Sequence, residues 1–472
     1  MSRVPERARN GNPIPPSPPH SRCPESRVPE RARKRKPHSS PHPSVLQKSR
    51  SIPMASSTLR CLPGDIPPTT LLTLPEEMLE EILLCLSDAA DLVRASMARV
   101  SIRRLVTNHR FLRRFRTRHP PPLLGIVSPY PLHRWDRPLL NLAQPPHPSA
   151  AAASAFSGLD AADFSCTFLP NAARWRRDLR DGRVLLSGLP KGTKFNSHAF
   201  VRDLAVSDPL SRRYILLPPI PDDLAALVQP PDLVRFDPFL APPVAEDEDG
   251  MSFRVICLAH CTTKLVLLIF SSSAGQWHPV TLENWIGLLT GSDNPAPGNH
   301  QDLYWLPRMR HYAHGYFCWA FYAKGSMYPV SKLLMLDTQS MGFSAVDLPP
   351  LTDNTRVIIL EAENGRIGMY MNENLTAELR YYVLQNDGVG ENQWLQKETL
   401  TLNDRYMLIG VAGGYLLLQG LRQDQYPFFL VSLDLKTLEL EWFLASRHTN
   451  VGARLFASFP PSLSPPTLRH DI

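Results

Sequence analysis

The sequence predicts an α+β multidomain chain, in which a small all-α bundle is followed by a larger all-β domain. Three observations lead to this prediction. Residues 71–119 carry apolar side chains at helical spacing, residues 156–456 consist of short β runs between Gly, Pro, Asp and Ser turns, and these runs recur with a period near 50 residues. The chain has 472 residues, 43% of them hydrophobic, which suffices for one large core and at least one smaller one.

The net charge of +7 originates in the first residues. Residues 1–53 hold 12 Lys and Arg against 3 Asp and Glu, a balance of +9 that leaves −2 for the rest of the chain. The same stretch contains 12 prolines and no aromatic residue, and its opening octet at residues 2–9 returns at residues 26–33. We therefore expect residues 1–60 to be a disordered basic tail. Residues 31–36 resemble a nuclear-localisation signal, with a solvated tail as the equally weighted alternative, so we expect the nucleus, the cytoplasm or both.

Composition excludes several classes of protein. No apolar run approaches the roughly 18–20 residues that span a bilayer, so we expect no membrane partner. The first residues lack the apolar segment of a secretory signal. The seven cysteines are an odd and scattered set, which predicts free thiols in a reducing compartment and no disulfide framework.

The helical segment has a clear start. Pro75 suits a first turn because its missing N–H would be unpaired there, and the two glutamates that follow favour the positive end of the helix dipole. Leu79, Ile82, Leu83 and Leu86 then follow at i, i+3, i+4 and i+7, which gives one apolar stripe.

Three further short helices are predicted after the first. Residues 87–91 end the first helix and offer caps for a second, Ser101 can cap a third, and residues 111–115 lie on a fourth. Residues 74–118 carry an apolar face at nearly every turn, more than so small a unit can enclose. The excess is expected to lie against the following domain or against another protein.

The order of these residues resembles an F-box. The resemblance is carried by Leu74-Pro75-x-Glu77-x-Leu79-x-x-Ile82-Leu83-x-x-Leu86, then by Asp91-Leu92-Val93-Arg94-Ala95 and Val100. The continuation over residues 101–125 is similar to a large group of plant F-box proteins. One departure is visible, because many F-boxes carry a Cys-x-x-Trp element in the third helix and this sequence has no Trp there.

The resemblance implies a noncatalytic substrate receptor of a Skp–cullin–F-box ubiquitin ligase. The F-box would bind a Skp-type adaptor and through it a cullin, and the β domain would bind an unknown protein substrate. Carried over by position, the adaptor face would consist of Leu74, Pro75, Leu79, Ile82, Leu83, Leu86, Leu92, Val93 and Val100.

Seven arginines within residues 103–118 raise nucleic-acid binding as an alternative. Phe111, Leu112 and Phe115 lie among them, which fits better with the buried side of a helix whose arginines are solvated. The sequence therefore does not favour a nucleic-acid partner.

Four β runs open with a glycine. These are Gly182, Gly315, Gly365 and Gly414, at spacings of 133, 50 and 49 residues. A period near 50 over roughly 300 residues gives six units if 133 stands for three periods with one shortened. Repeated units of short antiparallel strands are typical of a β-propeller, and we expect about six blades, with five or seven allowed. A β-sandwich, the alternative fold, does not predict such a recurrence. The plant F-box resemblance likewise implies a propeller-like domain.

A second repeated feature is a hairpin with an acidic turn, at Asp208, Asp337 and Asp434. An aspartate there can accept hydrogen bonds from the N–H groups of its own turn. Residues 120–155, rich in Pro and Ala, are expected to be a connector, and residues 457–472 a flexible tail. The tryptophans of the β region are expected to pack the blades: Trp277, Trp305, Trp319, Trp394 and Trp442.

Catalytic motifs are scarce. There is no nucleophile elbow, phosphate loop, zinc-protease helix or dinucleotide fingerprint, so we expect no catalytic residue and no cofactor. Cys257, His260 and Cys261, with His311 and His314, come nearest to a metal set, but the stretch is expected to be a strand end with free thiols. A propeller enzyme, such as a hydrolase with a helical appendage, remains the alternative and needs converging carboxylates or a metal in the ring channel.

Overall fold

The computed structural model describes most of the chain after residue 73. The described ranges are 74–86, 89–127, 140–157, 163–166, 168–169, 175–188, 200–228, 232–242, 251–290, 303–305, 309–323, 331–352, 354–373, 376–386, 392–420, 428–446, 452–459 and 467–468. The expected basic tail and the acidic run at residues 245–250 lie outside these ranges.

The four predicted helices are present. They are α1 (Glu76–Leu84), α2 (Ala89–Ala98), α3 (Val100–Val106) and α4 (His109–Arg118). Pro75 stands at the N-cap of α1, and α3 begins one residue before Ser101, with Arg99 as its N-cap. Their shared core holds Leu79, Leu83, Leu84, Leu92, Leu105, Val106, Phe111, Leu112 and Phe115, together with Phe459 from far along the chain. The apolar stripes therefore bury mainly against one another.

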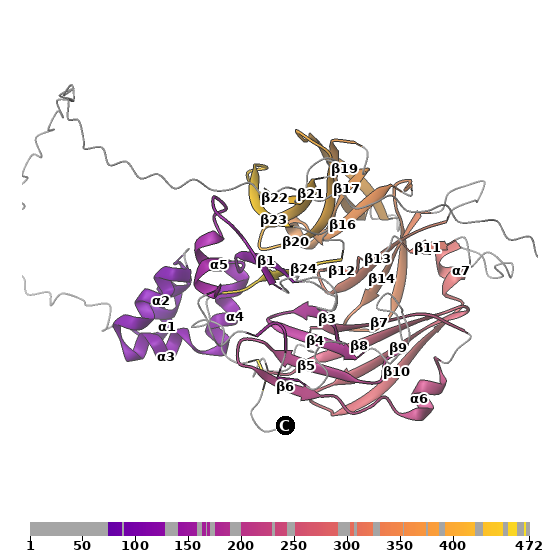
Figure 1. Cartoon of the computed structure of the whole chain (residues 1–472), viewed down its shortest axis with the longest axis horizontal. Coiled ribbons are helices and arrows are strands. Elements are labelled where there is room, and N and C mark those ends of the chain that lie inside the picture. The colour runs from indigo at the N-terminus through magenta and orange to yellow at the C-terminus, as the bar shows by residue number, and fades with distance from the viewer. Residues whose placement is uncertain are drawn as a thin grey trace, which may run out of the picture. The chain divides into compact units, whose positions relative to one another are not determined.

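The rest of the described chain forms a six-bladed β-propeller (Figure 1). Blade 1 consists of β1 (Leu123–Val127), β2 (Leu140–Leu142) and β24 (Arg454–Ala457). Blade 2 consists of β3 (Trp175–Arg180), β4 (Arg183–Gly188), β5 (Leu204–Asp208) and β6 (Arg213–Leu216). Blade 3 consists of β7 (Leu233–Ala241), β8 (Arg254–Cys261), β9 (Lys264–Ser271) and β10 (Gln276–Glu283).

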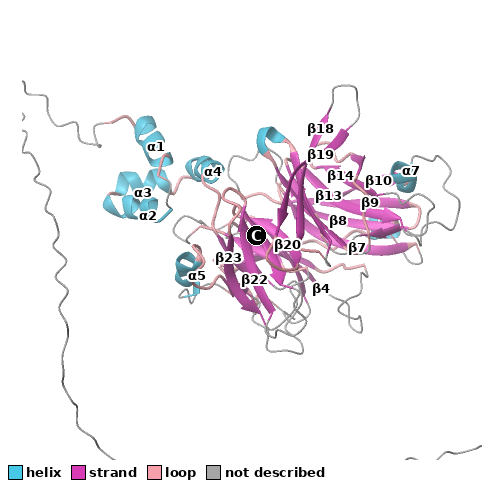
Figure 2. Ribbon diagram, turned by 90° about the horizontal axis from the view of Figure 1, so that it is seen from above, coloured by secondary structure: helices cyan, strands magenta, loops and turns pink. Residues whose placement is uncertain are grey.

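The remaining blades follow in chain order. Blade 4 consists of β11 (Leu303–Trp305), β12 (His311–Ala313), β13 (Tyr316–Ala323), β14 (Ser331–Asp337) and β15 (Phe343–Asp347). Blade 5 consists of β16 (Thr355–Glu361), β17 (Ile367–Glu373), β18 (Glu378–Asn386) and β19 (Asn392–Thr401). Blade 6 consists of β20 (Tyr406–Ala412), β21 (Tyr415–Gly420), β22 (Phe428–Asp434) and β23 (Leu440–Ser446). Short helices accompany the blades: α5 (Ala150–Ser157), α6 (Asp222–Ala226), α7 (Trp285–Thr290) and the 3-10 turn η4 (Glu363–Gly365). Figure 2 shows α5 and α7 beside the strands.

The apolar core lies between neighbouring blades. One cluster joins blades 2 and 3, others join blades 3 and 4, 4 and 5, 5 and 6, and 6 and 1. Along the axis, the inner strand β3 contacts β7, β12 contacts β16, β16 contacts β20, and β24 contacts both β20 and β3. No blade can bury both of its faces alone, so the fold depends on the ring. Trp319 is buried in the cluster between blades 3 and 4, as expected, whereas Trp442 is 37% exposed.

The ring closes through strands distant in the sequence. Strand β24 pairs antiparallel with β1, which pairs in turn with β2, so blade 1 combines residues from before and after the other five blades. Gly125 lies at this junction, where an added Cβ would stand 2.3 Å from the carbonyl oxygen of Asn141. The expected connector at 120–155 is therefore corrected, because it supplies two strands of a blade.

Both repeated turns are confirmed. The four glycines all have positive φ, between +70° and +87°, and each lies in a turn between consecutive strands of one blade: β3 and β4, β12 and β13, β16 and β17, and β20 and β21. Asp208 Oδ1 accepts from the N–H groups of Leu210 and Ser211, and Asp434 Oδ1 from those of Lys436 and Thr437. Asp337 Oδ1 accepts from Gln339 N at 2.8 Å.

The allocation of the repeats needs a correction. The 133-residue spacing between Gly182 and Gly315 covers two blade steps and not three, because these glycines belong to blades 2 and 4 and only blade 3 lies between them. The sixth unit is the blade that closes the ring. Six blades were thus the right number, reached through an incorrect assignment.

The expected flexible tail at 457–472 is also corrected where the structure describes it. Leu468 is 1% exposed and belongs to the core between blades 2 and 3. Thr467 donates from its N–H to Asp208 Oδ2 at 2.8 Å, and its carbonyl oxygen accepts from Arg183 at 2.8 Å. These contacts fix the segment on blade 2.

Two further expectations concern the thiols and membranes. Cys85, Cys166, Cys257, Cys261 and Cys318 are free thiols, which confirms the prediction for the cysteines that the structure describes. Among the helices it describes, none has the length and apolar character needed to cross a membrane.

Candidate functional site

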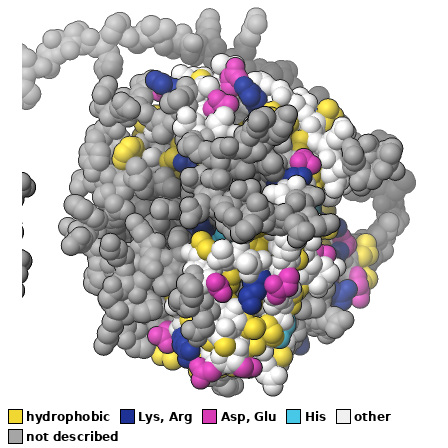
Figure 3. Space-filling view, turned by 90° about the vertical axis from the view of Figure 1, so that its right-hand side faces the viewer, with side chains coloured by type: hydrophobic (Ala, Val, Ile, Leu, Met, Phe, Trp, Pro, Cys, Tyr) yellow, Lys and Arg dark blue, Asp and Glu magenta, His cyan; other side chains and the backbone are white. Residues whose placement is uncertain are grey.

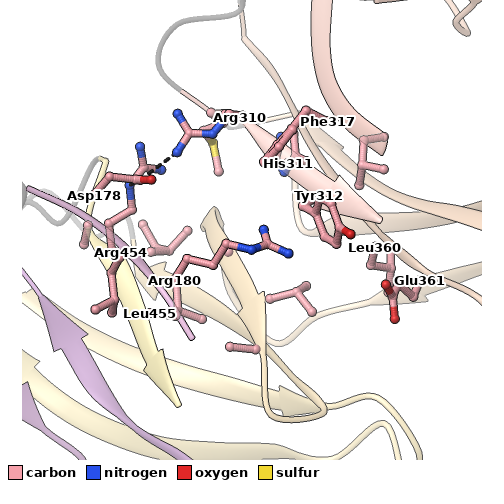
Figure 4. A pocket seen from close by; sticks show the side chains of 18 of the residues that line it. Asp178, Arg180, Arg310, His311, Tyr312, Phe317, Leu360, Glu361, Arg454 and Leu455 are labelled. Atoms are coloured by element: carbon pink, nitrogen blue, oxygen red, sulfur yellow. Dashed lines mark hydrogen bonds and ion pairs between the residues drawn. The ribbon is translucent and has the colours of Figure 1, made fainter. Parts of the chain in front are cut away.

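A cavity of about 550 Å³ lies where the inner strands of the blades converge (Figure 4). Residues of β3, β12, β16, β20 and β24 line it, and Leu240 of β7 adds a contribution from blade 3. Gly414 and Leu435 also line it, which places one end of the cavity near the turns that carry the repeated glycines. All six blades therefore contribute residues to the lining of the cavity.

The inner part of the cavity is held by ion pairs around Asp178. Its Oδ1 lies 2.6 Å from Arg310 Nη2 and 3.1 Å from Arg454 Nε, and its Oδ2 accepts from Leu240 N at 3.1 Å. Only 8% of the Asp178 side chain and 7% of the Arg310 side chain are exposed. Burial of a carboxylate without partners costs free energy, and the partners of Asp178 offset that cost.

Arg310 reaches the cavity because the inner edge of blade 4 is divided. Strands β11 and β12 both pair with β13, and Arg310 immediately precedes β12. Its second amino group, Nη1, lies 3.2 Å from Asp237 Oδ2, and its guanidinium lies 4.1 Å from the centroid of the Phe239 ring. The Arg310 fork is therefore engaged by two aspartates and an aromatic face.

Arg180 is arranged differently. Its guanidinium lies 3.9 Å from the ring centroid of Tyr312 and 5.6 Å from that of Phe317, so it reaches across the cavity, as Figure 4 shows. Its ion pair is made by Nε, which lies 3.3 Å from Oδ2 of Asp181, and that carboxylate is 66% exposed. Solvent weakens a pair of this kind.

The pKa of His311 reflects its burial and the positive charges around the cavity. Burial, and to a smaller extent the positive charges of Arg454 and Arg310, together lower its pKa to about 3. His311 is therefore a neutral imidazole near pH 7. Burial is also the main cause of the lowered pKa of Arg454, with Arg310 acting in the same direction and Asp178 in the opposite one.

The lining holds two carboxylates, Asp178 and Glu361. Asp178 is occupied by two arginines, and Glu361 Oε1 accepts from the backbone N–H of His314 at 3.0 Å. The two arginines thus give Asp178 a structural role, whereas a single backbone hydrogen bond holds the exposed Glu361. The sequence search for catalytic residues missed the arginines, although Arg180 stands two residues before a repeated glycine.

The cysteine and histidine set is not brought together as a metal site. In β8, Cys257 and Cys261 face the core between blades 2 and 3, whereas the His260 ring lies 4.5 Å from the Trp285 ring on the other face. Burial raises the pKa of Cys257 and of Cys261, so both are thiols near pH 7 and not thiolates. No group of three or more His, Cys, Asp or Glu among the described residues could hold a metal ion.

The nine residues predicted for the adaptor face divide into three groups. Leu79, Leu83 and Leu92 are buried in the bundle core. A second group is half-buried: Leu74, Leu86 and Val93. Pro75, Ile82 and Val100 are exposed, with Ile82 at 43% and Val100 at 84%. The expectation that the bundle cannot enclose its apolar side chains therefore applies to far fewer residues than the sequence indicated.

Two exposed methionines extend the apolar surface of the bundle. Met78 is 53% exposed and lies four residues before Ile82 on α1, so the two share a helix face. Met97 is 80% exposed and lies near Val100, where α2 gives way to α3. Neither was included in the predicted face, although both belong to the apolar pattern of the sequence.

Exposed apolar side chains are sparser in the described part of the propeller. They contain five large apolar side chains that are exposed, distributed over four blades: Tyr214, Leu216, Val234, Leu395 and Trp442. On the face shown in Figure 3, the described acidic and basic side chains lie close to one another, and apolar side chains are scattered among them.

The arginine-rich helix has the predicted arrangement. Phe111, Leu112 and Phe115 are buried, while the arginines of α4 are exposed or half-buried. Arg114 pairs with Glu80 and Glu81 of α1. These arginines therefore lie on the solvated side of the bundle.

No protein-family model matches the chain, and no curated protein is significantly similar to it in sequence. Among solved structures, a post-proline cleaving enzyme from Rickettsia typhi aligns with a TM-score of 0.33 and 11% identity, over 59% of this chain and 37% of that chain. An oligogalacturonate lyase in complex with manganese aligns with a TM-score of 0.31 and 11% identity, over 59% of this chain and 65% of that one.

A puromycin-hydrolysing peptidase of Mycobacterium tuberculosis gives a TM-score of 0.31 and 12% identity, over 60% of this chain and 40% of that chain. The chain thus spans less than two thirds of the length of these three structures. Similarities this low carry no argument about activity.

Proposed function

We propose that the chain is a noncatalytic substrate receptor of a Skp–cullin–F-box ubiquitin ligase, acting in the nucleus or the cytoplasm. One observation carries the proposal. Of the nine large apolar side chains that are exposed in the described part of the chain, four lie within the 23 residues from Met78 to Val100. This is the segment whose sequence resembles an F-box, and exposed apolar side chains gathered in one segment are typical of a protein-binding surface.

The proposed mechanism divides the work between two parts of the chain. The helices bind the Skp-type adaptor through the exposed residues Met78, Ile82, Met97 and Val100. The propeller holds the protein substrate, so that its lysines are kept at a high effective concentration near the charged ubiquitin-conjugating enzyme. Chemistry at the lysine is then performed by other subunits, and the chain itself supplies only binding and orientation.

The test replaces an exposed apolar residue by a charge. Ile82→Asp is expected to reduce co-purification of the full chain with a Skp-type adaptor by at least about tenfold, because a desolvated carboxylate has no partner in an apolar contact. Leu395→Asp is the matched control, since Leu395 is 44% exposed on β19 of the propeller and Ile82 is 43% exposed. Leu79 is unsuitable, because it is 8% exposed and a charge there would disrupt the bundle core.

The result is interpretable only if both variants keep the fold. Far-ultraviolet circular dichroism and the melting temperature are expected to agree with the parent chain within a few degrees. Adaptor binding that survives both Ile82→Asp and Met78→Asp would show that this surface is not the docking face.

A propeller enzyme is the second candidate, and the central cavity favours it. Its charged lining and its volume of about 550 Å³ are within the range of small-molecule sites. Hydrolysis of nitrophenyl esters, phosphates or glycosides by the full chain would support this function, provided that Glu361→Gln abolishes it. Glu361 is suited to this test because its carboxylate lies at an exposed position of the lining.

A further inference from the structure

The carboxylates in and around the central cavity do not engage every donor group of its arginines. Arg180, Arg310 and Arg454 line it, against Asp178 and Glu361. Asp178 serves two of the arginines, and Glu361 is exposed and engaged with a backbone N–H. Asp181 and Asp237 also pair with Arg180 and Arg310, so the cavity offers an anion unused guanidinium donors and not an unbalanced charge.

We propose that this cavity binds an acidic segment of a partner protein, with a carboxylate or phosphate group held between Arg180 and Arg454. The identification of that partner as a ubiquitination substrate rests on the function proposed above. Binding of an anionic group here is independent of it.

The geometry of Arg180 supports this assignment. Stacking on Tyr312 at 3.9 Å fixes the plane of its guanidinium, and the ion pair with Asp181 uses Nε. Among the contacts of the described residues, no hydrogen bond or ion pair uses its two terminal amino groups. These groups form the fork that binds a planar carboxylate or a phosphate in a bidentate manner.

Arg454 provides a second donor group. Its Nε faces Asp178 at 3.1 Å, and in the described part of the chain its terminal amino groups have no hydrogen bond or ion pair either. Arg310 differs, because both of its terminal amino groups already face aspartates. We therefore assign Arg310 and Asp178 to the support of the site, and Arg180 and Arg454 to the contact with the anion.

The surroundings disfavour a cationic ligand. His311 is neutral, so it can donate or accept a hydrogen bond without adding a charge. Tyr312 and Phe317 offer aromatic faces, but arginine side chains already cover them. A peptide carrying lysines would place its charge against two guanidinium groups and lose affinity.

The test uses the full chain and three labelled peptides. They are a Gly-flanked hexaglutamate, a Gly-spaced peptide with two phosphoserines, and hexalysine, and inorganic pyrophosphate serves as a small-anion probe. Fluorescence anisotropy is expected to show saturable binding of at least one anionic peptide, weakened by salt, and none of hexalysine. The two anionic peptides distinguish an encoded carboxylate from an added phosphate.

Variants locate the binding. Arg180→Gln is expected to weaken the affinity for the peptide by about tenfold. Arg180→Lys is expected to weaken it less, because lysine keeps the charge and loses only the guanidinium fork. Arg202→Gln is the control, since Arg202 is 50% exposed and pairs with exposed Asp222. Because the ion pair of Arg180 is made with an exposed carboxylate, its replacement is expected to leave the fold intact, and an unchanged melting temperature verifies this.

Two results would overturn the proposal. One is the absence of saturable binding of either anionic peptide, including the case in which pyrophosphate alone binds. The other is equal affinity of the parent chain and Arg180→Gln. Adaptor co-purification of Arg180→Gln separates the two proposals. If this variant loses the peptide but still binds the adaptor, the substitution affects only the cavity. If the parent chain binds the peptide but never captures the adaptor, only the proposed receptor function is contradicted.

Discussion

At the scale of single residues, the turn glycines show how backbone conformation selects a residue type. Gly365 has a φ of +70°, a conformation that costs an L-residue about 1–2 kcal/mol. Nothing lies within 4 Å of the position that a Cβ would take there, so the cost of adding one is conformational and not steric. The repeated aspartates act locally as well, through hydrogen bonds to their own turns. Such features were predictable because each depends on three or four consecutive residues.

Gly365→Ala is therefore expected to lower the free energy of unfolding by about 1–2 kcal/mol. Gly342→Ala is the matched control, since Gly342 lies in another turn without a positive φ and its added Cβ would meet only the Ser340 hydroxyl, at 3.3 Å. Urea denaturation of both variants measures the difference. Equal losses would show that the conformation of Gly365 carries no such cost.

A buried histidine makes the stability depend on pH. His147 is 2% exposed, its Nδ1 accepts from Ser149 N at 3.1 Å, and its Nε2 lies 3.0 Å from the Ser432 hydroxyl. Burial lowers its pKa from 6.5 to about 4. The unfolded chain thus binds this proton more readily, and the stability that is complete above pH 6.5 is lost as the pH falls toward 4.

His147 is expected to contribute a loss of about 2 kcal/mol between pH 7.5 and pH 5. His147→Gln is expected to be less stable than the parent at pH 7.5, because a fitted ring is lost, but to show a shallower decline. Urea denaturation at the two pH values measures both slopes. A variant with the full pH dependence of the parent would contradict this assignment.

At the scale of elements, local pattern sufficed for the helices and most of the strands. It failed for the segment around Thr467, where Pro460-Pro461 and Pro465-Pro466 indicated a loose end. The two described residues of this segment are too few for a periodic signal, and their order derives from contacts with blade 2 and with the core behind it. The cavity arginines were missed for a related reason, since they come from three separate blades.

Leu468→Ala is expected to destabilise the propeller by about 2–5 kcal/mol, because Leu468 is buried in the core between blades 2 and 3. Leu216→Ala on β6 is the control, as Leu216 is 55% exposed and its loss is expected to cost less than about 0.5 kcal/mol. Thermal melting of the two variants distinguishes them. Similar melting temperatures of the two variants would contradict the buried position of Leu468 and support a flexible C-terminal tail.

At the scale of the whole molecule, the number of blades followed from the sequence, but the closure of the ring did not. Gly125 and Phe456 pair across blade 1, although more than 300 residues separate them. Blade 1 has three strands and no repeated glycine turn, so it does not contribute to the recurrence of about 50 residues in the sequence. Its contribution was predictable only from the requirement that a ring have no free edge.

A chain that ends at residue 453 lacks β24 and is expected to lose cooperative melting, because blades 2 and 6 lose their contact with that strand. A chain that ends at residue 469 retains β24 and Leu468 and is expected to melt as the parent does. Circular dichroism at increasing temperature measures both. A cooperative transition in the shorter chain would mean that five blades and a partial sixth are self-sufficient.

The pairing of β24 with β1 also has a consequence for synthesis on the ribosome. Strand β1 emerges before the other five blades, and its open edge must wait until residues 454–457 have been translated. At roughly 5–20 residues per second, that interval lasts on the order of tens of seconds. The nascent chain therefore exposes one unpaired edge of an apolar strand throughout that time, and cellular yield of the protein should depend on chaperones that cover it.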